Sequence, residues 1–289
     1  MRIEMTDYLN HKNDFDSPDI ASLVDELSFW SSRFGSMLFD QIEIRKSVNI
    51  LDVGCATGFP LFELAHVFGD SSHVTGIDIW QHALDRARFK LKTYGLQNVT
   101  VIEADGAHQP FPDSEFDLIT SNLGINNWAD PLGVLNECFR VAKPDAKILL
   151  TTNVVGHYKE FYEVFRNTLV EMNKSECVAR LSAQEEHRGT RESHCAVLEK
   201  AGWVVVKIVE NSFEMRFADA NALFNHSLTK LGFLDGWKSV VEPMDQTEVF
   251  TRVEQKLDQI AQRDGELRMT VPMLCIEGIN LPASGRPRK

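Results

Sequence analysis

The sequence predicts a doubly wound α/β fold, and three observations lead to this prediction. From Val48 onward, short apolar runs alternate with stretches of helical periodicity, which is typical of a parallel sheet with helices on both faces. One of these runs, Leu51–Val53, passes into a glycine turn at Gly54–Gly58, and Phe59-Pro60 then opens a helix. A mostly helical segment at 212–265 interrupts the alternation before one last apolar run.

The length and composition are those of an ordinary globular protein. A chain of 289 residues with 43% hydrophobic and 25% charged residues can bury a core as one elaborated domain or as two small domains. The net charge of −12 argues against nucleic acid as a partner, because phosphate binding depends on Lys and Arg. The dense basic cluster Arg286–Lys289 is interpreted as a solvated tail.

Targeting signals and metal-binding patterns are missing from the sequence. Apolar runs stay shorter than about eighteen residues, so we expect no membrane span, and the polar N-terminus lacks the order of a signal peptide. The five cysteines form no CxxC pair and no metal-ligand spacing. Free thiols in a reducing compartment explain them most simply, so we expect a cytoplasmic protein without a metal site.

Residues 1–47 are expected to form a helical cap. Ser17 can cap a helix that Pro18 begins. Apolar residues then recur at helical spacing: Ile20, Leu23, Val24, Leu27, Trp30, Phe34, Met37, Leu38 and Ile42. Gly35 is a point where this stripe can break. The apolar face needs a partner, and the sheet that follows is the obvious one.

The expected strands are recognised as buried apolar runs. They are Val48–Val53, Val74–Ile79, Val99–Ala104, Phe116–Ser121, Lys147–Thr152, Trp203–Val209 and Leu267–Gly278. Between the first five of these strands, helices begin at Pro60, near Trp80 and at Pro131. Asp130 caps the helix that begins at Pro131. Gly69 and Gly95 stand where the first two of these helices should end.

After Thr152 the pattern becomes mainly helical. We expect an amphipathic helix from Tyr158 to Leu169, a charged stretch over Asn173–Arg191, and a helix through Cys195–Lys200 that stops at Gly202. Further helical spacing covers 223–231 and 249–260, with Asp245–Glu248 as a capping box for the second helix. This excursion could serve as a lid or as a dimerisation arm, and the sequence leaves both open.

The glycine turn separates two classes of cofactor-binding protein. The dinucleotide fingerprint G-x-G-x-x-G would need glycine at Ala56 and Phe59. The spacing that is present, D-x-G-x-x-x-G from Asp52 to Gly58, resembles motif I of class I S-adenosylmethionine (SAM)-dependent methyltransferases. The resemblance runs from about Val48 to Thr152 and includes features at the ends of three further strands. A nicotinamide cofactor would explain an acid at Asp78, but neither the glycine spacing nor Asp105.

This resemblance implies a fold and a division of the chain. The fold is a Rossmann-like, seven-stranded, doubly wound α/β sheet whose last strand is antiparallel. The N-terminal helical cap then covers 1–47, the SAM-binding Rossmann-like core 48–211, and the helical insertion 212–265. Residues 266–289 supply the last strand of the core and the basic tail.

The resemblance also assigns cofactor contacts residue by residue. The glycine loop under the methionyl and ribose groups corresponds to Asp52, Gly54, Cys55, Thr57 and Gly58, with Ala56 where glycine is commoner. Asp78 would accept both ribose hydroxyls, Ile79 and Trp80 would flank the adenine, and Asp105 between Ala104 and Gly106 would accept from its amino group. Asn122 and Leu123, after the fourth strand, would face the methionyl group.

The acceptor is less well determined than the cofactor. Gly124-Ile125-Asn126-Asn127 is similar to the Gly-Leu-Arg-Asn of ubiquinone and menaquinone C-methyltransferases, with Asn126 in place of arginine. A plain polar turn before Asp130 explains the same residues. Substrate-pocket candidates are Trp30, Asn126, Asn127, Trp128 and Tyr158. Aromatic residues at helical spacing are also typical of a core.

A general base is needed only when the acceptor carries a proton. His157 stands where the resemblance places substrate-side residues, although a cap or surface residue of the next helix is the simpler interpretation. We therefore expect a SAM-dependent methyltransferase that moves a methyl group to a small-molecule acceptor by in-line displacement, leaving S-adenosylhomocysteine. The alternatives are a SAM-binding regulatory module without catalysis and an enzyme that methylates a protein. The oligomeric state is open.

Overall fold

The computed structural model describes residues 6–25 and 27–281, which fall into two compact units. Unit 2 comprises Phe15–Asn153, Arg191–Glu210 and Met273–Lys289. Unit 1 comprises Met1–Asp14, Val154–Thr190 and Asn211–Pro272. This division differs from the four expected segments, because the N-terminal cap and the last strand each contribute to both units. The basic tail Arg286–Lys289 lies outside the described residues.

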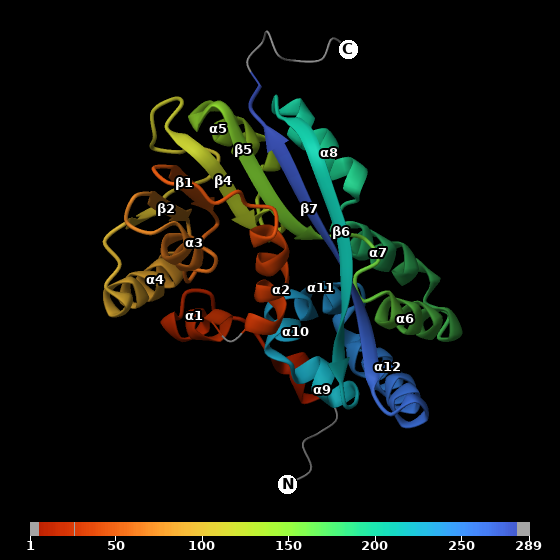
Figure 1. Cartoon of the computed structure of the whole chain (residues 1–289). Helices are drawn as coiled ribbons and strands as arrows, with labels where there is room; N and C mark the ends of the chain where they lie inside the picture. Colours follow the sequence, from red (N-terminus) through yellow and green to blue (C-terminus); the bar gives the residue numbers. More distant parts are fainter. Residues whose placement is uncertain (1–5, 26, 282–289) are drawn as a thin grey trace. The chain divides into compact units, whose positions relative to one another are not determined.

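A seven-stranded sheet of order β3-β2-β1-β4-β5-β7-β6 is formed by the described residues (Figure 1). The strands are β1 Asn49–Val53, β2 His73–Asp78, β3 Val99–Glu103, β4 Phe116–Asn122, β5 Ala142–Asn153, β6 Val204–Phe217 and β7 Leu267–Ile279. The strands β1 to β5 pair in parallel, whereas β7 pairs antiparallel with β5. The expected fold is therefore confirmed.

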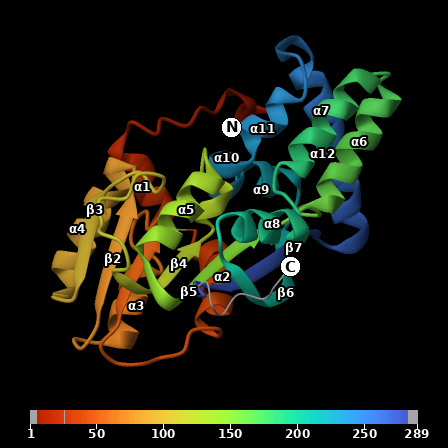
Figure 2. The same cartoon turned by 90° about the horizontal axis from the view of Figure 1, so that it is seen from above.

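The helices of unit 2 lie on both faces of its strands. They are α1 Pro18–Asp25, α2 Ser28–Phe39, α3 Leu61–Phe68, α4 Gln81–Tyr94, the 3₁₀ turn η2 Gly124–Asn126, α5 Pro131–Val141 and α8 Arg191–Lys200. Figure 2 shows α5 and α8 on one side of the strands and α2 and α3 on the other. Leu51, Ile119 and Leu64 are completely buried in the core between these layers.

Unit 1 is mainly helical. It contains η1 Asp7–Asn10, α6 Lys159–Glu171, α7 Ser175–Glu186, α9 Ala220–Asn225, α10 Ser227–Gly232, α11 Leu234–Ser239 and α12 Pro243–Asp264. Helices α7, α6 and α12 pack side by side (Figure 2). Aromatic rings fill the core: Phe161 stacks on Trp237 at 4.0 Å between ring centroids, and Tyr8 stacks on Phe224 at 4.4 Å.

Several expected local signals are confirmed. The Asp130 side chain accepts a hydrogen bond from the Gly133 amide and so caps α5. Gly69 and Gly95 end α3 and α4 with positive φ angles of 65° and 69°. The left-handed region accommodates glycine without a Cβ clash, which explains why the helices stop there.

Other local predictions differ from the structure. The N-terminal stripe forms two helices rather than one, because Leu27 leaves the helical conformation with ψ 26°. The proposed capping box Asp245–Glu248 is wrong: α12 already begins at Pro243, a residue preorganised for the first helical position. The charged stretch after Asn173 contains helix α7. Strand β6 continues to Phe217, eight residues past the expected end, because it lies beside β7, a strand far away in sequence that local periodicity does not reveal.

Candidate functional site

The glycine turn is held at the carboxyl end of β1 by backbone hydrogen bonds to β2. The amides of Gly54 and Cys55 both donate to the Ile77 carbonyl, at 2.9 and 3.1 Å. The Ala56 amide donates to Oδ2 of Asp78 at 2.9 Å, and the Trp80 amide donates to Oδ1 of the same carboxylate at 2.9 Å. One side chain therefore fixes both the turn after β1 and the start of α4.

The turn depends on left-handed backbone at three residues. The φ angles are 80° at Gly54, 43° at Ala56 and 106° at Gly58. A Cβ at Gly58 would collide with the Phe62 ring, so glycine is required there by space as well as by φ. Ala56 adopts a conformation that is unfavourable for an L-residue by about 1–2 kcal/mol. It is a strained position rather than a neutral replacement of glycine.

The residues present suit the ribose of SAM. Each Asp78 oxygen accepts one backbone N–H and, as an ionised carboxylate with about four lone-pair positions, keeps one acceptor site open. Two open acceptor sites on one half-buried carboxylate match the two hydroxyls of a ribose diol. The neighbouring Ile79 side chain is 71% exposed and leaves an apolar surface for a ring beside the carboxylate.

Asp52 lies below the turn and is completely buried. Burial raises the pKa of its carboxyl to about 7, the hydrogen bond from Thr120 opposes this shift, and the negative charge of Asp78 adds to it. Thr120 Oγ1 donates to Asp52 Oδ1 at 2.9 Å, while Oδ2 has no hydrogen-bond partner among the described residues. Asp52 thus ties the end of β1 to β4 in the core, directly before the turn. Cys55, beside it, is buried as well, and burial raises the pKa of its thiol.

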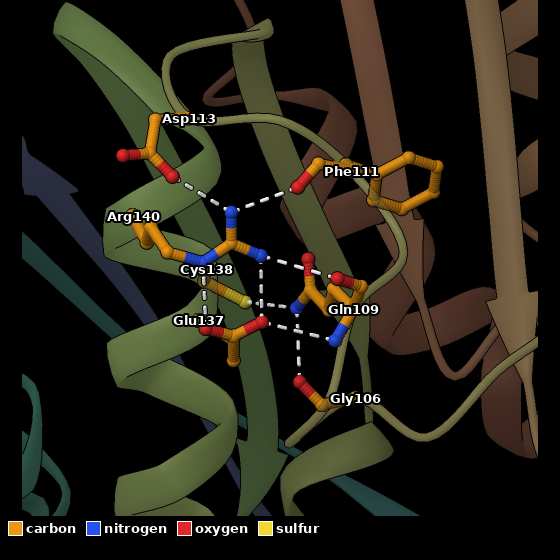
Figure 3. Close-up of polar contacts among 7 residues, drawn as sticks. All are labelled: Gly106, Gln109, Phe111, Asp113, Glu137, Cys138 and Arg140. Carbon is orange, nitrogen blue, oxygen red and sulfur yellow. Dashed lines mark hydrogen bonds and ion pairs between the residues drawn. The ribbon is translucent and has the colours of Figure 1, made fainter.

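The loop after β3 carries Ala104, Asp105 and Gly106 and is clamped onto α5 (Figure 3). Asp105 is exposed and accepts from the Ala107 amide at 2.9 Å; this bond and the contact with His108 lower its pKa. The Gly106 carbonyl accepts from Nε2 of Gln109 at 3.0 Å. The loop geometry that presents Asp105 is therefore fixed by hydrogen bonds within the loop.

Arg140 on α5 holds this loop in place (Figure 3). Its guanidinium donates to the carbonyls of Phe111 at 2.8 Å and Gln109 at 3.1 Å, and it pairs with Glu137 at 2.7 Å. Oε2 of Glu137 in turn accepts from the Gln109 amide at 3.0 Å. This support was not predicted from the sequence. The signal available was the i, i+3 spacing of Glu137 and Arg140, which is too common on helices to indicate a role by itself.

The turn after β4 packs directly on the glycine turn. A Cβ at Gly54 would lie 3.5 Å from Gly124 Cα and 4.0 Å from Trp128 Nε1. Leu123 adopts φ 68° and reverses the chain into η2. Gly54, Gly124 and Trp128 are thus brought together, whereas Asn127 is exposed.

The Asn122 side chain is occupied by protein contacts. Its Oδ1 accepts from Thr151 Oγ1 at 2.7 Å, and its Nδ2 donates to the Ser31 carbonyl of α2 at 3.1 Å. The amide therefore ties β4 to β5 and to the helix that carries Trp30. Trp30 itself is buried, with its ring 5.3 Å from that of Phe34, which is the core packing that helical spacing of aromatics commonly indicates.

Two N-terminal residues that were not predicted from the sequence, Asp25 and Phe15, contact the candidate site. Asp25 pairs with Arg86 and Lys90 of α4 at 2.7 and 2.8 Å. Burial raises the pKa of Asp25, but hydrogen bonds from Lys90, Thr57 and Arg86 outweigh burial and lower it overall. Thr57 is buried in the glycine turn, and its hydroxyl donates a hydrogen bond to the Asp25 carboxylate at the end of α1.

Phe15 contacts the other end of the candidate site. Its carbonyl accepts from Trp80 Nε1 at 3.1 Å, and the two rings lie edge to face at 6.0 Å. The Trp80 ring is therefore held by its own hydrogen bond rather than left free to rotate.

His157 and Tyr158 belong to unit 1. His157 is 3% exposed, its ring stacks on Tyr158 at 4.0 Å, and it lies 4.7 Å from the Phe233 ring. Burial, with a further contribution from Arg188, lowers the pKa of His157 well below 6.5. The alternative of a cap or surface residue is wrong, because the ring is packed among aromatic side chains. With this lowered pKa, His157 would be only a weak general base in the catalytic role expected from the sequence.

Two further properties concern the described part of the chain. Within residues 6–25 and 27–281, no helix combines the length and apolar character needed to cross a bilayer. No group of three or more His, Cys, Asp or Glu side chains in the same ranges is arranged to hold a metal ion.

Comparison with known proteins gives consistent matches. The model of a methyltransferase domain family matches residues 44–202. The chain is 35% identical over 130 residues to a demethylmenaquinone methyltransferase of Anoxybacillus flavithermus, and 34% identical over 129 residues to one of Listeria welshimeri. These segments are 44% and 43% of this chain and 55% of each relative, so the chain spans about half the length of the curated relatives it matches.

Solved structures agree in fold. The YcgJ protein of Bacillus subtilis has a TM-score of 0.57 at 16% identity, covering 87% of this chain and 100% of its own. A SAM-dependent methyltransferase of Aquifex aeolicus has a TM-score of 0.52 at 23% identity, covering 68% of this chain and 93% of its own. The class expected from the turn at Gly54–Gly58 is confirmed by the family match.

Proposed function

Since the chain belongs to the methyltransferase domain family, we propose that it transfers the methyl group of SAM to a small aromatic molecule. The observation that carries the proposal is the Asp78 carboxylate, which holds the glycine turn through Ala56 and keeps two acceptor sites open. Asp78 would bind the ribose hydroxyls, with the turn Gly54–Gly58 beneath the methionyl group. Ile79 and Trp80 would flank the adenine, and Asp105 would accept from its amino group.

In methyl transfer from SAM, the main task of the protein is to align the acceptor atom with the methyl group. SAM held by the glycine turn and Asp78 would supply a sulfonium methyl group: the S–CH₃ electron pair would stay on sulfur, the acceptor atom would form the new bond from its own pair, and the proton that the acceptor carried would be released. The chain's residues then bind, orient and exclude water, which brings the reacting atoms into line. The buried turn, packed against Gly124 and Trp128, provides a rigid wall for that alignment.

An aromatic acceptor of quinol type is supported by two features. The curated relatives, which match 44% and 43% of this chain, are named demethylmenaquinone methyltransferases. Trp128 presents an indole next to the glycine turn, where a flat ring can stack. The acceptor would therefore approach from the end of β4, opposite the side on which Asp78 and Asp105 lie.

The test combines binding with turnover. The full chain is titrated calorimetrically with SAM, and then incubated anaerobically with methyl-labelled SAM and 1,4-naphthoquinol. We expect SAM binding, and a product heavier by one methylene unit detected by mass spectrometry. No SAM binding would refute the proposal. SAM binding without transfer to quinols, catechols or phenols would favour the regulatory module, whereas label found only in added protein would favour a protein acceptor.

A further inference from the structure

A chain of hydrogen bonds at the carboxyl ends of β4 and β5 ends in an amide group without a partner. Thr152 Oγ1 lies 2.6 Å from Asn126 Oδ1, and Asn126 Nδ2 donates to Asn153 Oδ1 at 2.8 Å. Nδ2 of Asn153 is buried and has no hydrogen-bond partner among the described residues. The Asn153 residue as a whole is 1% exposed.

Which groups donate and which accept in this row of hydrogen bonds follows from the single hydroxyl proton of Thr152. That hydroxyl has two acceptors in reach, Asn126 Oδ1 at 2.6 Å and the Asn153 carbonyl at 3.0 Å. The proton serves the shorter contact, which makes Asn126 donate and Asn153 accept. Both hydrogens of the Asn153 amide group are then left over, so the group is an oriented donor.

An unpaired buried amide is unfavourable by about 1–3 kcal/mol, so this donor requires an oxygen supplied from outside the described side chains. Its place in the fold indicates which molecule supplies it. The expected ribose and adenine contacts lie on the turns after β1, β2 and β3, and the expected methionyl contacts Asn122 and Leu123 follow β4, whereas β5 is the second neighbour of β1 on that side. Adjacent strands are about 4.8 Å apart, so the end of β5 lies roughly 10 Å from that of β1, on the acceptor side.

The turn η2 connects this donor to the glycine turn. Gly124, at its start, packs against Gly54, while Asn126, at its end, holds Asn153. We propose that Asn153 is an acceptor-binding residue whose Nδ2 donates to a carbonyl or hydroxyl oxygen beside the methyl-accepting atom. An uncharged donor of this kind selects oxygen-bearing rings and disfavours ammonium groups, which have no lone pair to offer. This inference rests on the proposed function and specifies its substrate class.

The experiment uses two ligands that differ in one acceptor oxygen. 1-Tetralone carries a ring ketone that can only accept a hydrogen bond, and tetralin is the matching hydrocarbon. The full chain is saturated with S-adenosylhomocysteine and titrated with each ligand at pH 8.5. We expect tetralone to bind about tenfold more tightly than tetralin, the effect of one neutral hydrogen bond. Equal affinities would overturn the proposal.

The Asn153→Asp variant separates ligand binding from support of the loop. Its retained oxygen still accepts from Asn126, so η2 keeps its anchor, but the donor is replaced by a carboxylate oxygen. We expect the tetralone advantage to vanish at pH 8.5, with tetralin affinity unchanged, and to return as lower pH protonates the new carboxyl. Asn98→Asp is the control: it is equally a buried amide, bonded to the carbonyls of Ala65 and Gly69, and should keep the advantage.

The outcomes distinguish this inference from the proposed function. If S-adenosylhomocysteine does not bind, both fall together. If it binds and quinol is methylated, but Asn153→Asp keeps the tetralone preference, only the role of Asn153 is wrong. Should the variant fail to fold, the wild-type Asn153 side-chain amide is followed by ¹⁵N NMR. Its proton resonances should shift downfield with tetralone and stay in place with tetralin, and unchanged resonances with both would overturn the assignment.

Discussion

The carboxylate of Asp78, at the end of β2, accepts a hydrogen bond from the backbone amide of Ala56 at 2.9 Å. Two turns that lie more than twenty residues apart in sequence are joined by this contact. Asp78 therefore shapes the glycine turn and, in the proposed function, would also bind the ribose hydroxyls.

Replacing Asp78 should weaken SAM binding through both functions. Asp78→Asn keeps one oxygen for a backbone amide but turns an N–H toward the other. We expect at least about a tenfold rise in the SAM dissociation constant by calorimetry, the usual loss for a hydrogen bond to a charged group. Asp85→Asn, on the exposed face of α4, is the control and should leave affinity unchanged. An Asp78→Asn protein with wild-type affinity would exclude the ribose contact.

Ala56 offers a test of backbone strain. With φ 43° it should gain stability on replacement by glycine, and we expect Ala56→Gly to raise the free energy of unfolding by up to about 1 kcal/mol. Ala87→Gly, in the interior of α4, should lower it by at least about 0.5–1 kcal/mol. Urea denaturation measures both changes. Destabilisation of the same size in both variants would contradict the strained conformation.

The raised pKa of Asp52 predicts a pH dependence of stability. Its carboxyl titrates near 3.8 in the unfolded chain and at about 7 in the folded protein, because burial disfavours the charge. The unfolded state therefore releases this proton first, and the contribution of Asp52 to stability falls as pH rises from about 4 to 7. The slope is about 1.4 kcal/mol per pH unit at most. Asp52→Asn should remove this component, so its stability relative to wild type should increase toward pH 7. Urea titrations at pH 4, 5.5 and 7 measure this, and a constant difference would refute the shift.

His157 should remain neutral throughout the physiological pH range. Its pKa lies well below 6.5, so a titration of this ring cannot shape the rate of methyl transfer between pH 6 and 8. We expect His157→Gln to leave the shape of the pH–rate profile unchanged in that range, even if the absolute rate falls through altered packing. Disappearance of an ionisation near pH 6.5 in the variant would instead support a general base at this position.

Arg140 should be irreplaceable by lysine. A point charge cannot satisfy the Phe111 and Gln109 carbonyls and Glu137 at once, because these bonds use the planar fork of the guanidinium. Arg140→Lys should lower the free energy of unfolding by about 1–2 kcal/mol and weaken SAM binding through the loop that carries Asp105. Arg88→Lys, whose exposed side chain pairs with the exposed Asp85, should change stability by less than about 0.5 kcal/mol. Equal effects of the two variants would show that the loop does not depend on Arg140.

The sequence by itself determined the alternation of strands and helices in the core, the glycine turn and the placement of Asp78 and Asp105 at strand ends. These depend on local periodicity, on helix-ending glycines such as Gly69 and Gly95, and on a family pattern of short spacing. Each of these signals depends only on residues close together in sequence, so it can be recognised before the fold is known.

Only the tertiary structure decided which polar groups are occupied. Asn122 and Asn126 look equivalent in sequence, yet Thr151 and Ser31 use up the first amide, whereas Asn126 passes its hydrogen bond on to Asn153. The division into two units, the clamp by Arg140 and the burial of His157 likewise arise from contacts between residues far apart in the chain. The hydrogen-bond partners and the burial of a side chain depend on residues that become neighbours only in the folded protein, so no local sequence pattern predicts them.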